Sequence, residues 1–537
     1  MSVRDPDTSA AMGRGRTKII AALLLCALTL TLFVWNVNRY SFLGDDAFIS
    51  FRYARNLVEG HGLVWNPGER VEGYTNFLWV VLMAMGMLFK IAPEVLSNIL
   101  GTASGVAVLL LLVRLGAKYH GWRSPVIWLP PVVLATSRTF TAWCTGGLAA
   151  MFFTMLVFLA LVRFADEREK PELSPCLSSL LFAAAALTRP EGNIFAAVAG
   201  VFFLVGLFQG KRRIKAFVLW LLPFAAIVGA HLIWRRYYYG YWLPNSFYAK
   251  VSGFWGEQAY HYLSMFHRDY KVFLFAPVAL LPVIVRRHFI DGLFAASIAA
   301  YLAYVVYVGG DRFEFRFLVP LLPLFYWLLA EGIALIASVG KVRQGVRRIA
   351  FVVAAGLALT LWVSTYLGST RPEAKKTRYD IASIEEIRAY AERRAREGKF
   401  LRELIERRLL PDDLVLCVTG AGAVPYYSGL PTVDLYGMND TTIAHMEISE
   451  RGVIAHEKRG SSDYMRERGV EIFDRLNKLV HDVPVQNQSC PDNRGCWKSI
   501  KVGTYHLNFV TFLPDTEYER RFGSLLRARD LSIGFPP

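Results

Sequence analysis

The stretch KIIAALLLCALTLTLFVWNVNRYSF, residues 18–42, is long and apolar enough to cross a membrane, and it decides the fold class. A hydrocarbon core about 30 Å thick is spanned by a helix of about 20 apolar residues. Arg14, Arg16 and Lys18 precede or open the run, which is too long for a signal-peptide core and has no small-residue cleavage pattern after it. We therefore expect a retained helix whose preceding tail, residues 1–17, lies in the cytoplasm.

Ten further apolar runs follow, and they predict a polytopic α-helical membrane protein with about eleven transmembrane helices. The chain has 537 residues, 54% of them hydrophobic, and a mean hydropathy of +0.32. A soluble protein of this size could not hide so much apolar sequence from water. The predicted spans after the first are residues 74–90, 95–114, 141–162, 174–189, 192–209, 214–235, 271–285, 290–308, 317–339 and 347–368.

One apolar segment, residues 125–140, is short for a span and contains Pro130 and Pro131. We interpret it as a partial or re-entrant helix, because a full crossing would put the first loop and the C-terminal region on opposite faces. This choice leaves three nearby cations on the outer face, against the usual charge rule. They are Arg114, Lys118 and Arg123.

The net charge of +16 is concentrated in short loops between apolar runs, which is typical of cytoplasmic loops. No zinc finger, RNP-type strand or basic helix supports nucleic-acid binding, so nucleic acid is excluded as a partner. The basic loops are Arg163–Lys170, Lys211–Lys215, Arg286–His288 and Lys341–Arg348. The outer face then carries the first external loop (43–73), the loops around residues 190, 240–270 and 309–316, and the C-terminal region.

The composition changes after residue 368, where the transmembrane domain (18–368) ends. Residues 369–537 are charged, with a helical stretch near 380–409 and strand-like runs such as DLVLCVT (413–419), which predicts an extracytoplasmic α/β domain. Cys490 and Cys496 flank a polar turn there, and outside the cytoplasm we expect them to form a disulfide. A metal site is the weaker alternative, because no histidine lies within that turn.

The first external stretch, GDDAFISFRYARNLVEGHGLVWNPGERVEGYTNFLW (44–79), has two adjacent acids at a helix end. Asp45 and Asp46 repel each other, so one of them is a candidate general base and the other a binding or orienting carboxylate. A helix cap with a solvated charge is the alternative. Arg52 lies on an amphipathic segment, where it either binds phosphate or reaches lipid headgroups.

Three more polar stretches fall on the same face: LTRPEGN (187–193), RRYYYGYWLPNSFYAK (235–250) and GGDRFEFRFLVPLLP (309–323). Their cations are candidate phosphate ligands, although ion pairing within each loop and an aromatic interfacial belt are alternatives. Carboxylates, cations, amides and rings next to lipid suit a substrate with a sugar, a phosphate and a long apolar tail.

These stretches, together with GAVPYYSGLPTVDLYGMND (422–440), resemble the GT-C class of membrane glycosyltransferases. Within that class the chain is similar to the arabinofuranosyltransferase-like branch, whose members act on the mycobacterial cell wall or on type IV pilin. The resemblance implies a GT-C fold and transfer of D-arabinofuranose from a polyprenyl-phosphate donor to a cell-envelope glycan or protein. It also implies an active site on the outer face of the bacterial inner membrane.

The resemblance implies the catalytic residues, and the other polar side chains on the same face are candidate ligands. The catalytic carboxylate of the first external loop corresponds to Asp45 and Asp46. The expected donor-phosphate ligands are Arg189, Lys250, Arg316 and Arg52, and the expected sugar or acceptor ligands are Tyr74, Asn76, Glu191, Asn245, Asp311 and Asp434. The family pattern has an acid where this chain has Ala149, which implies a different acceptor or an impaired site.

No trusted metal motif is present, and a divalent cation stays an open alternative as cofactor. Transfer of another lipid-linked sugar, mannose or aminoarabinose, is the second interpretation within the same class. A transporter is the main alternative from another class, but it would show paired halves with broken helices and charge near the bilayer midplane.

Overall fold

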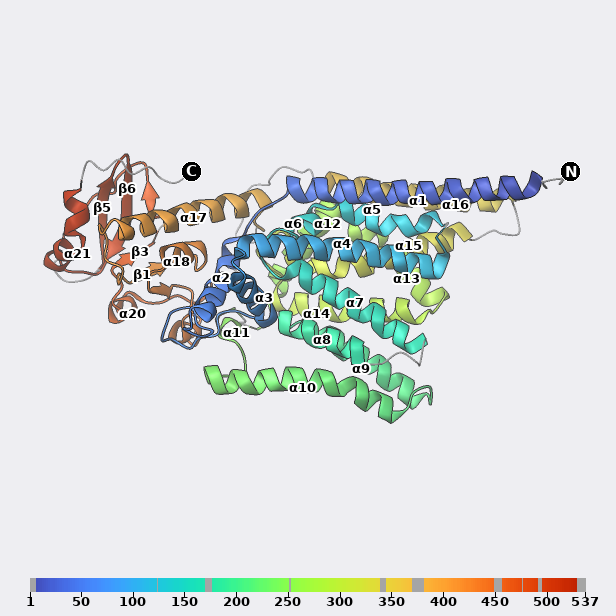
Figure 1. The fold of residues 1–537 in the computed structure, drawn as a ribbon, viewed down its shortest axis with the longest axis horizontal. Helices are drawn as coiled ribbons and strands as arrows, with labels where there is room; N and C mark the ends of the chain where they lie inside the picture. Colours follow the sequence, from blue (N-terminus) through green and yellow to red (C-terminus); the bar gives the residue numbers. More distant parts are fainter. Residues whose placement is uncertain are drawn as a thin grey trace.

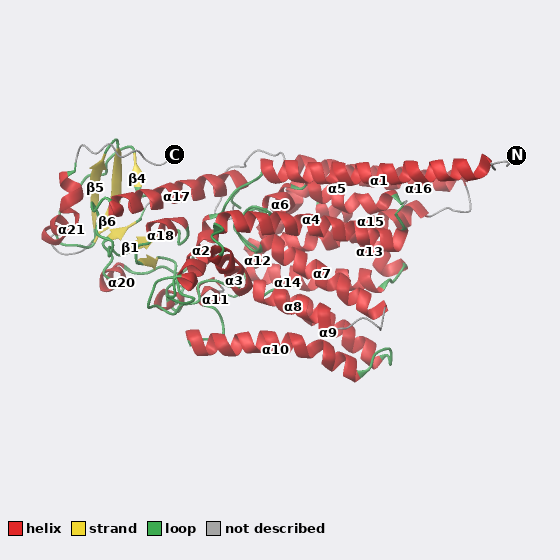
Figure 2. Cartoon of the chain, viewed as in Figure 1, coloured by secondary structure: helices red, strands yellow, loops and turns green. Residues whose placement is uncertain are grey.

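The computed structural model divides into a long helical bundle and a smaller α/β domain at one end of it (Figure 1). Figure 2 shows that every strand belongs to the smaller domain. The structure describes residues 6–122, 124–169, 176–250, 253–338, 344–368, 381–448, 456–475, 477–490 and 495–528. Lys170, the segment Lys341–Arg343 of a predicted basic loop, Arg123 and residues 369–380 lie outside these ranges.

Among the described residues, six helices are long and apolar enough to cross a membrane, and five shorter helices are also apolar. Most bundle helices follow the predicted runs, because each run of apolar side chains is continuous over several turns. The predicted span 141–162 is shifted: α7 covers residues 150–169 and so includes most of a segment predicted as a loop. The bundle helices are α1 (Pro6–Arg39), α4 (Pro93–His120), α7 (Ala150–Glu169), α8 (Cys176–Thr188), α9 (Gly192–Phe208), α10 (Ile214–Tyr239), η2–α13 (Val272–Phe275, Ala276–Val285), α14 (Phe289–Val308), η3–α15 (Arg316–Leu321, Leu322–Ser338) and α16 (Gln344–Gly368).

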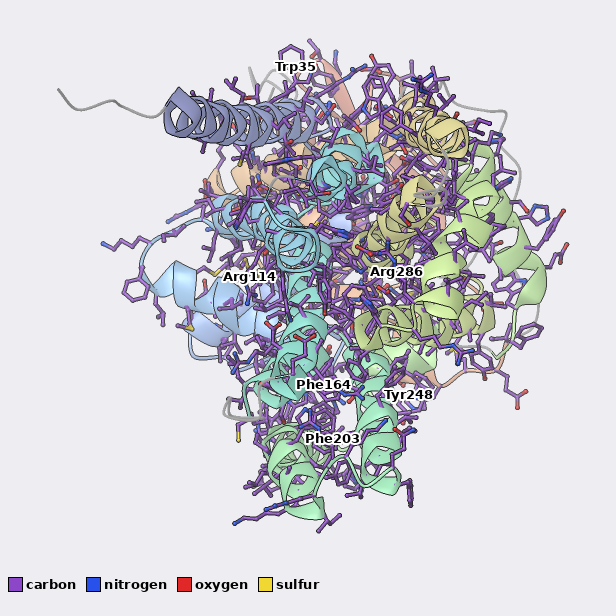
Figure 3. All side chains as sticks on the ribbon, turned by 90° about the vertical axis from the view of Figure 1, so that its right-hand side faces the viewer. Trp35, Arg114, Phe164, Phe203, Tyr248 and Arg286 are labelled. Atoms are coloured by element: carbon purple, nitrogen blue, oxygen red, sulfur yellow. A yellow bond between two sulfur atoms is a disulfide. The ribbon has the colours of Figure 1, made fainter. Side chains whose placement is uncertain are left out.

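The end of the bundle far from the α/β domain gathers the basic loops, and we name it the basic end. Arg114 of α4 pairs with Asp166 of α7 at 3.1 Å, and Lys118 pairs with the same carboxylate at 2.7 Å. Arg286 pairs with Glu331 of α15 at 2.7 Å. Figure 3 looks onto this end and labels Arg114 and Arg286.

The segment predicted as a partial helix crosses the bundle instead. It forms η1 (Pro125–Trp128), α5 (Leu129–Thr136) and α6 (Arg138–Ala142), and it packs between α1, α4, α15 and α16. Asn36 of α1 donates a hydrogen bond to the carbonyl of Ala135 at 3.0 Å. Neighbouring helices thus supply hydrogen-bond partners for backbone groups that lose their partners where the helix is interrupted. A broken helix is therefore tolerated there. Arg114 and Lys118 accordingly lie at the basic end, and the conflict with the charge rule disappears.

The predicted span 74–90 does not cross. It contains α3 (Phe77–Leu88), whose 12 residues reach about 18 Å, short of the roughly 30 Å core. Before α3, Asn76 donates a hydrogen bond to Ser50 of α2 (Asp45–Val58) at 3.0 Å. After α3, Glu94 at the start of α4 accepts one from Tyr427 of the α/β domain at 3.0 Å. The chain therefore enters and leaves α3 at the same end, which we name the site end.

The site end also carries three further helices that lie outside the crossing segments. They are α2 (Asp45–Val58), α11 (Asn245–Lys250) and α12 (Gly256–Tyr270). The amphipathic sequence of α2 buries its apolar face against α3 and α18 (Ala423–Ser428), so the segment 43–73 lies between the bundle and the α/β domain.

The α/β domain opens with α17 (Ile384–Glu406), which begins at a capping box made by Ser383 and Glu386. Its sheet has the order β2-β1-β3-β6-β4, with β5 paired to β6. β1, β2 and β3 are parallel, and β6 is antiparallel to β3, β4 and β5. The elements are β1 (Leu416–Val418), α18 (Ala423–Ser428), β2 (Thr432–Asp434), α19 (Thr441–Ala444), α20 (Ser462–Glu467), β3 (Ile472–Phe473), β4 (Val480–His481), β5 (Cys496–Val502), β6 (Tyr505–Thr511) and α21 (Asp515–Arg527).

Candidate functional site

The two adjacent acids at the start of α2 have different surroundings. The carboxylate of Asp45 is buried and accepts hydrogen bonds from the backbone N–H groups of Gly422, at 3.2 Å, and Ala423, at 2.8 Å. Burial raises the pKa of Asp45 above its ordinary value, against the opposing hydrogen bond from Ala423. A Cβ on Gly422 would lie 1.9 Å from the Asp45 carbonyl oxygen, so this contact requires glycine. Asp45 thus joins the start of α2 to the α/β domain.

Asp46 faces a cluster of cations. Its carboxylate lies 3.6 Å from the guanidinium of Arg312, and its side chain is 18% exposed. Burial opposes ionisation, but the charges of Arg312, Lys250 and Arg316 outweigh it and lower the pKa of Asp46 below 3.8. The structure therefore presents Asp46 as an ionised, partly accessible carboxylate, whereas the carboxylate of Asp45 is occupied by backbone donors.

The loop that carries Arg312 is held on both sides. The backbone N–H of Ala382, just before α17, donates to the carbonyl of Arg312 at 2.8 Å. Glu314 accepts a hydrogen bond from Arg138 of α6 at 2.8 Å, and both side chains are buried. Gly310 has a φ of +84°, and a Cβ there would lie 2.5 Å from the ring of Tyr262. These contacts place the guanidinium of Arg312 over Asp46.

Asp311 and Arg316 come from the same loop and form an ion pair of 2.7 Å. The guanidinium of Arg316 also lies 5.6 Å from the ring centre of Phe317. Arg189 packs on Phe317 as well, 5.1 Å from its ring centre. A row of cations therefore runs from the Asp46 cluster toward the loop between α8 and α9.

Arg189 is engaged by Glu191, the acid two residues later in the same turn. The guanidinium donates to both Glu191 oxygens at 2.7 and 3.3 Å, and Tyr304 donates to Glu191 at 3.3 Å. This is the pairing within the loop that the sequence left as the alternative to phosphate binding. Arg189 still lies beside the row of cations, but its charge is compensated.

Lys250 ends α11, whose position depends on Asn245. The Asn245 amide donates to the carbonyls of Gly437 and Met438 at 2.9 and 3.0 Å. Within the described ranges, the Lys250 ammonium makes no ion pair within 4.0 Å. Burial lowers the pKa of Lys250 and the charge of Asp46 opposes this shift, but the charges of Arg316 and Arg312 lower the pKa further. Asn245 therefore holds the loop in place. Among the described residues Lys250 has no ion-pair partner, whereas Arg189 is paired with Glu191.

His456 belongs to the site although the sequence does not predict it. Its ring stacks on Tyr436, with 4.1 Å between ring centres, and its Nε2 lies 3.0 Å from the guanidinium of Arg312. Burial, followed by the charge of Arg312, holds the pKa of His456 well below 6.5, so the ring is neutral at pH 7. A single histidine in a loop far along the chain carries no local signal that would have identified it.

Four predicted ligands serve packing instead of facing the Asp46 cluster. The buried guanidinium of Arg52 donates to the carbonyls of Trp65, Pro425 and Leu430, which leaves it no arrangement for a phosphate. The other three are engaged as follows: Tyr74 bonds Tyr239 at 3.1 Å, Asn76 bonds Ser50, and Asp434 accepts from Asn439 within a buried turn. Arg52, Tyr74, Asn76 and Asp434 thus hold the site end together.

Two further expectations concern the α/β domain and metals. Cys490 and Cys496 form a disulfide.

Within the described ranges, no three His, Cys, Asp or Glu side chains gather as metal ligands. The acids nearest the site, Asp46 and Asp311, lie among arginines and a lysine, and this arrangement suits an anionic substrate.

Comparison with known sequences and structures agrees with this architecture. The sequence model of the Alg9-like mannosyltransferase family matches residues 73–394, more than half of the chain. A domain of unknown function, DUF8728, matches residues 385–519. The crystal structure of ArnT from Cupriavidus metallidurans bound to undecaprenyl phosphate superimposes with a TM-score of 0.51 at 12% identity, covering 76% of this chain and 85% of that one. The two chains share a fold.

Two curated relatives are both named terminal beta-(1->2)-arabinofuranosyltransferase. The one from Mycobacterium tuberculosis is 29% identical over 274 residues, which cover 48% of this chain and 43% of the relative. The one from Corynebacterium glutamicum is 26% identical over 400 residues, which cover 66% and 56%. The chain thus spans about half the length of the curated relatives it matches.

Proposed function

This chain belongs to the Alg9-like mannosyltransferase family, and we propose that it transfers a sugar from a polyprenyl-phosphate donor to an acceptor of the cell envelope. The observation that carries the proposal is the Asp46 carboxylate beside Arg312, Lys250 and Arg316 at the end of an apolar bundle. A carboxylate can accept a proton, and clustered cations can hold a phosphate next to lipid. The names of the curated relatives favour D-arabinofuranose as the sugar.

The reaction has a simple balance of bonds. The acceptor hydroxyl oxygen attacks the anomeric carbon of the sugar, and the bond from that carbon to the phosphate oxygen breaks. The electron pair of the broken bond leaves with the polyprenyl phosphate, and the hydroxyl proton moves to Asp46. Because a phosphate is a good leaving group, a single carboxylate is sufficient for this scheme, whereas glycoside hydrolysis uses two.

Asp46 is the base in this proposal, and Asp45 positions it. The buried carboxylate of Asp45 already accepts two backbone hydrogen bonds, whereas Asp46 is accessible and ionised. Arg312, Lys250 and Arg316 stabilise the charge that grows on the leaving phosphate. The neutral ring of His456 orients Arg312.

The site end faces the outside of the cell in this proposal, and the basic end faces the cytoplasm. The cations at the basic end support this orientation through the positive-inside rule. The Cys490–Cys496 disulfide supports it independently, since disulfides persist in oxidising compartments. The α/β domain then holds the acceptor, a glycan or a surface protein, over the site.

Mannose is the second candidate sugar, because the family model that matches most of the chain is named for mannosyltransferases. Purified full-length protein is to be incubated with synthetic polyprenyl-phosphate donors carrying arabinofuranose, mannose or aminoarabinose, with a panel of acceptors. Released polyprenyl phosphate measures turnover. Turnover with the arabinofuranosyl lipid that D46N abolishes would support the proposal in full.

Three other outcomes of this experiment would change the proposal. Turnover with mannose alone would keep the mechanism and replace the sugar. Full turnover in folded D46N would contradict the assignment of the base. Absence of both turnover and donor binding would contradict the proposed function and favour transport of a lipid-linked substrate.

A further inference from the structure

A cavity lies at the basic end of the bundle, far from Asp46. Its volume is about 180 Å³, and it is bounded by the ends of α7, α9 and α14 and by the loop between α9 and α10. Its walls include Phe164, Phe203 and Phe289, and three cations: Arg168, Lys211 and Arg212. Figure 3 looks onto this end and labels Phe164 and Phe203.

The arginines of the cavity rest on its aromatic rings. The guanidinium of Arg168 lies 3.8 Å from the ring centre of Phe289, and that of Arg212 lies 4.9 Å from the ring centre of Phe203. Burial lowers the pKa of Arg212, the neighbouring charge of Arg168 lowers it further, and the charge of Glu167 opposes this shift. The two arginines are thus close enough to repel each other.

The nearest described carboxylates already have other partners. Glu167 accepts hydrogen bonds from Arg163 at 2.9 Å and from Ser178, and Glu169 pairs with Lys118 at 2.6 Å. Arg212 reaches only the backbone carbonyl of Glu167, at 3.4 Å. Within the described ranges, the structure therefore brings three cations together without a carboxylate that pairs with them.

The outer face of α9 beside the cavity is apolar and exposed. Phe208, at the end of α9, is 87% exposed, and Val201 and Val205 on the same helix are 57% and 47% exposed. A ligand seated here would have its anionic group among the cations and its apolar part along α9. The volume suits a headgroup phosphate better than a drug-sized molecule, whose pockets start at about 300 Å³.

We propose that this cavity binds the phosphate of an anionic phospholipid from the leaflet at the basic end, through Arg168, Lys211 and Arg212. Guanidinium groups form paired, charge-assisted hydrogen bonds with phosphate oxygens, and basic pockets between transmembrane helices are suited to anionic headgroups. The lipid would neutralise the three cations and fasten α9 to α7 and α14. This site does not depend on the proposed glycosyl transfer.

The test is native mass spectrometry of full-length protein in detergent, titrated separately with phosphatidylglycerol, phosphatidylcholine and inorganic phosphate. The variant R168Q/R212Q removes two cations of the cavity. R213Q/K215Q removes two exposed cations from the same region that do not line the cavity, so it is the matched control. K211Q tests the exposed member of the cavity without changing buried packing.

We expect phosphatidylglycerol to bind more tightly than phosphatidylcholine. R168Q/R212Q should weaken phosphatidylglycerol binding by about tenfold or more, because each lost charge-assisted hydrogen bond contributes substantially. K211Q should weaken it less, and R213Q/K215Q should leave it unchanged. Equal weakening in the cavity and control variants, or binding that ignores the headgroup, would overturn the proposal. Saturation by inorganic phosphate without a lipid preference would overturn the assignment to a lipid.

Discussion

The carboxylate of Asp46 lies 3.6 Å from the guanidinium of Arg312, and this contact joins the start of α2 to the loop that precedes η3. The preceding residue, Asp45, turns instead to the N–H groups of Gly422 and Ala423. The two adjacent carboxylates therefore have different roles. Asp46 faces the cations, and Asp45 holds the α/β domain against α2.

The first prediction separates these two roles. D46N should lower turnover by about 100-fold to 10,000-fold, the usual contribution of a general base, with an unchanged melting temperature. D45N should lower the melting temperature, because an amide cannot accept both backbone hydrogen bonds as well as a carboxylate does. Turnover and thermal unfolding of the same preparations measure both effects.

G422A serves as a second route to the Asp45 contact, since a Cβ would collide with the Asp45 backbone. It should reproduce the thermal destabilisation of D45N. Equal turnover losses in D45N and D46N, with both variants thermally intact, would argue against a division of roles.

The second prediction concerns pH. The charge of Arg312 helps keep the pKa of Asp46 below 3.8, so the wild type should keep its base ionised throughout the range from pH 5 to 8. Removing that charge in R312Q should raise the pKa, and activity should then be lost at a higher pH as the solution is acidified. The acidic limb of kcat/KM against pH measures this shift. R407Q, which removes an exposed arginine of the α/β domain, should leave the limb where it is in the wild type.

The third prediction concerns Lys250. Burial, together with two neighbouring arginines, lowers the pKa of Lys250 below 10.5 despite the opposing charge of Asp46. The ammonium should therefore lose its proton, and with it the phosphate contact, as the pH rises through this lowered value. K250R keeps its charge at every accessible pH. An alkaline limb in the wild type that is absent from K250R is the expected outcome, and the same limb in both enzymes would exclude Lys250 as its origin.

The fourth prediction concerns a buried ion network between α17 and the residue that follows β3. Arg394 pairs with Glu397 at 2.7 Å and with Asp474 at 2.5 Å, and all three side chains are fully buried. R394M leaves two carboxylates without their cation and should destabilise the α/β domain by about 3–5 kcal/mol. R402M removes an exposed pair on the same helix, and it should cost no more than about 0.5 kcal/mol. Thermal unfolding of the two variants gives the comparison.

The fifth prediction concerns the disulfide. Cys490 and Cys496 close a short loop, so C490S should destabilise the α/β domain by about 2 kcal/mol. A reducing agent should lower the melting temperature of the wild type and leave that of C490S unchanged. A variant that responds to the reductant as strongly as the wild type would show that the effect comes from elsewhere.

Most of the helices could be predicted from the sequence, because each depends on contiguous apolar residues that need burial wherever they lie. The capping box at Ser383 and the polar stretches at the span ends are likewise encoded within a few residues. Two segments differ from the prediction. The segment 125–140 has two prolines and reads as an interrupted helix, yet it crosses, because Asn36 and the surrounding helices satisfy its backbone. The run 74–90 is apolar enough to span, yet α3 stays at the site end.

The candidate site divides in the same way. The sequence marks the loops that carry Asp46, Lys250 and Arg316, because dense polarity beside apolar runs is a local feature. The sequence does not show that Asp45 and Asp46 have different partners. It also does not show that Arg52 donates its hydrogen bonds to backbone carbonyls, or that His456 lies beside Arg312. Those assignments depend on contacts between residues far apart in the chain, which form only when the bundle and the α/β domain pack together. Composition and spacing therefore determine most of the crossing segments, because contiguous apolar residues need burial, and they show where polar side chains gather. Tertiary packing alone decides which carboxylate is buried and which one faces the cations.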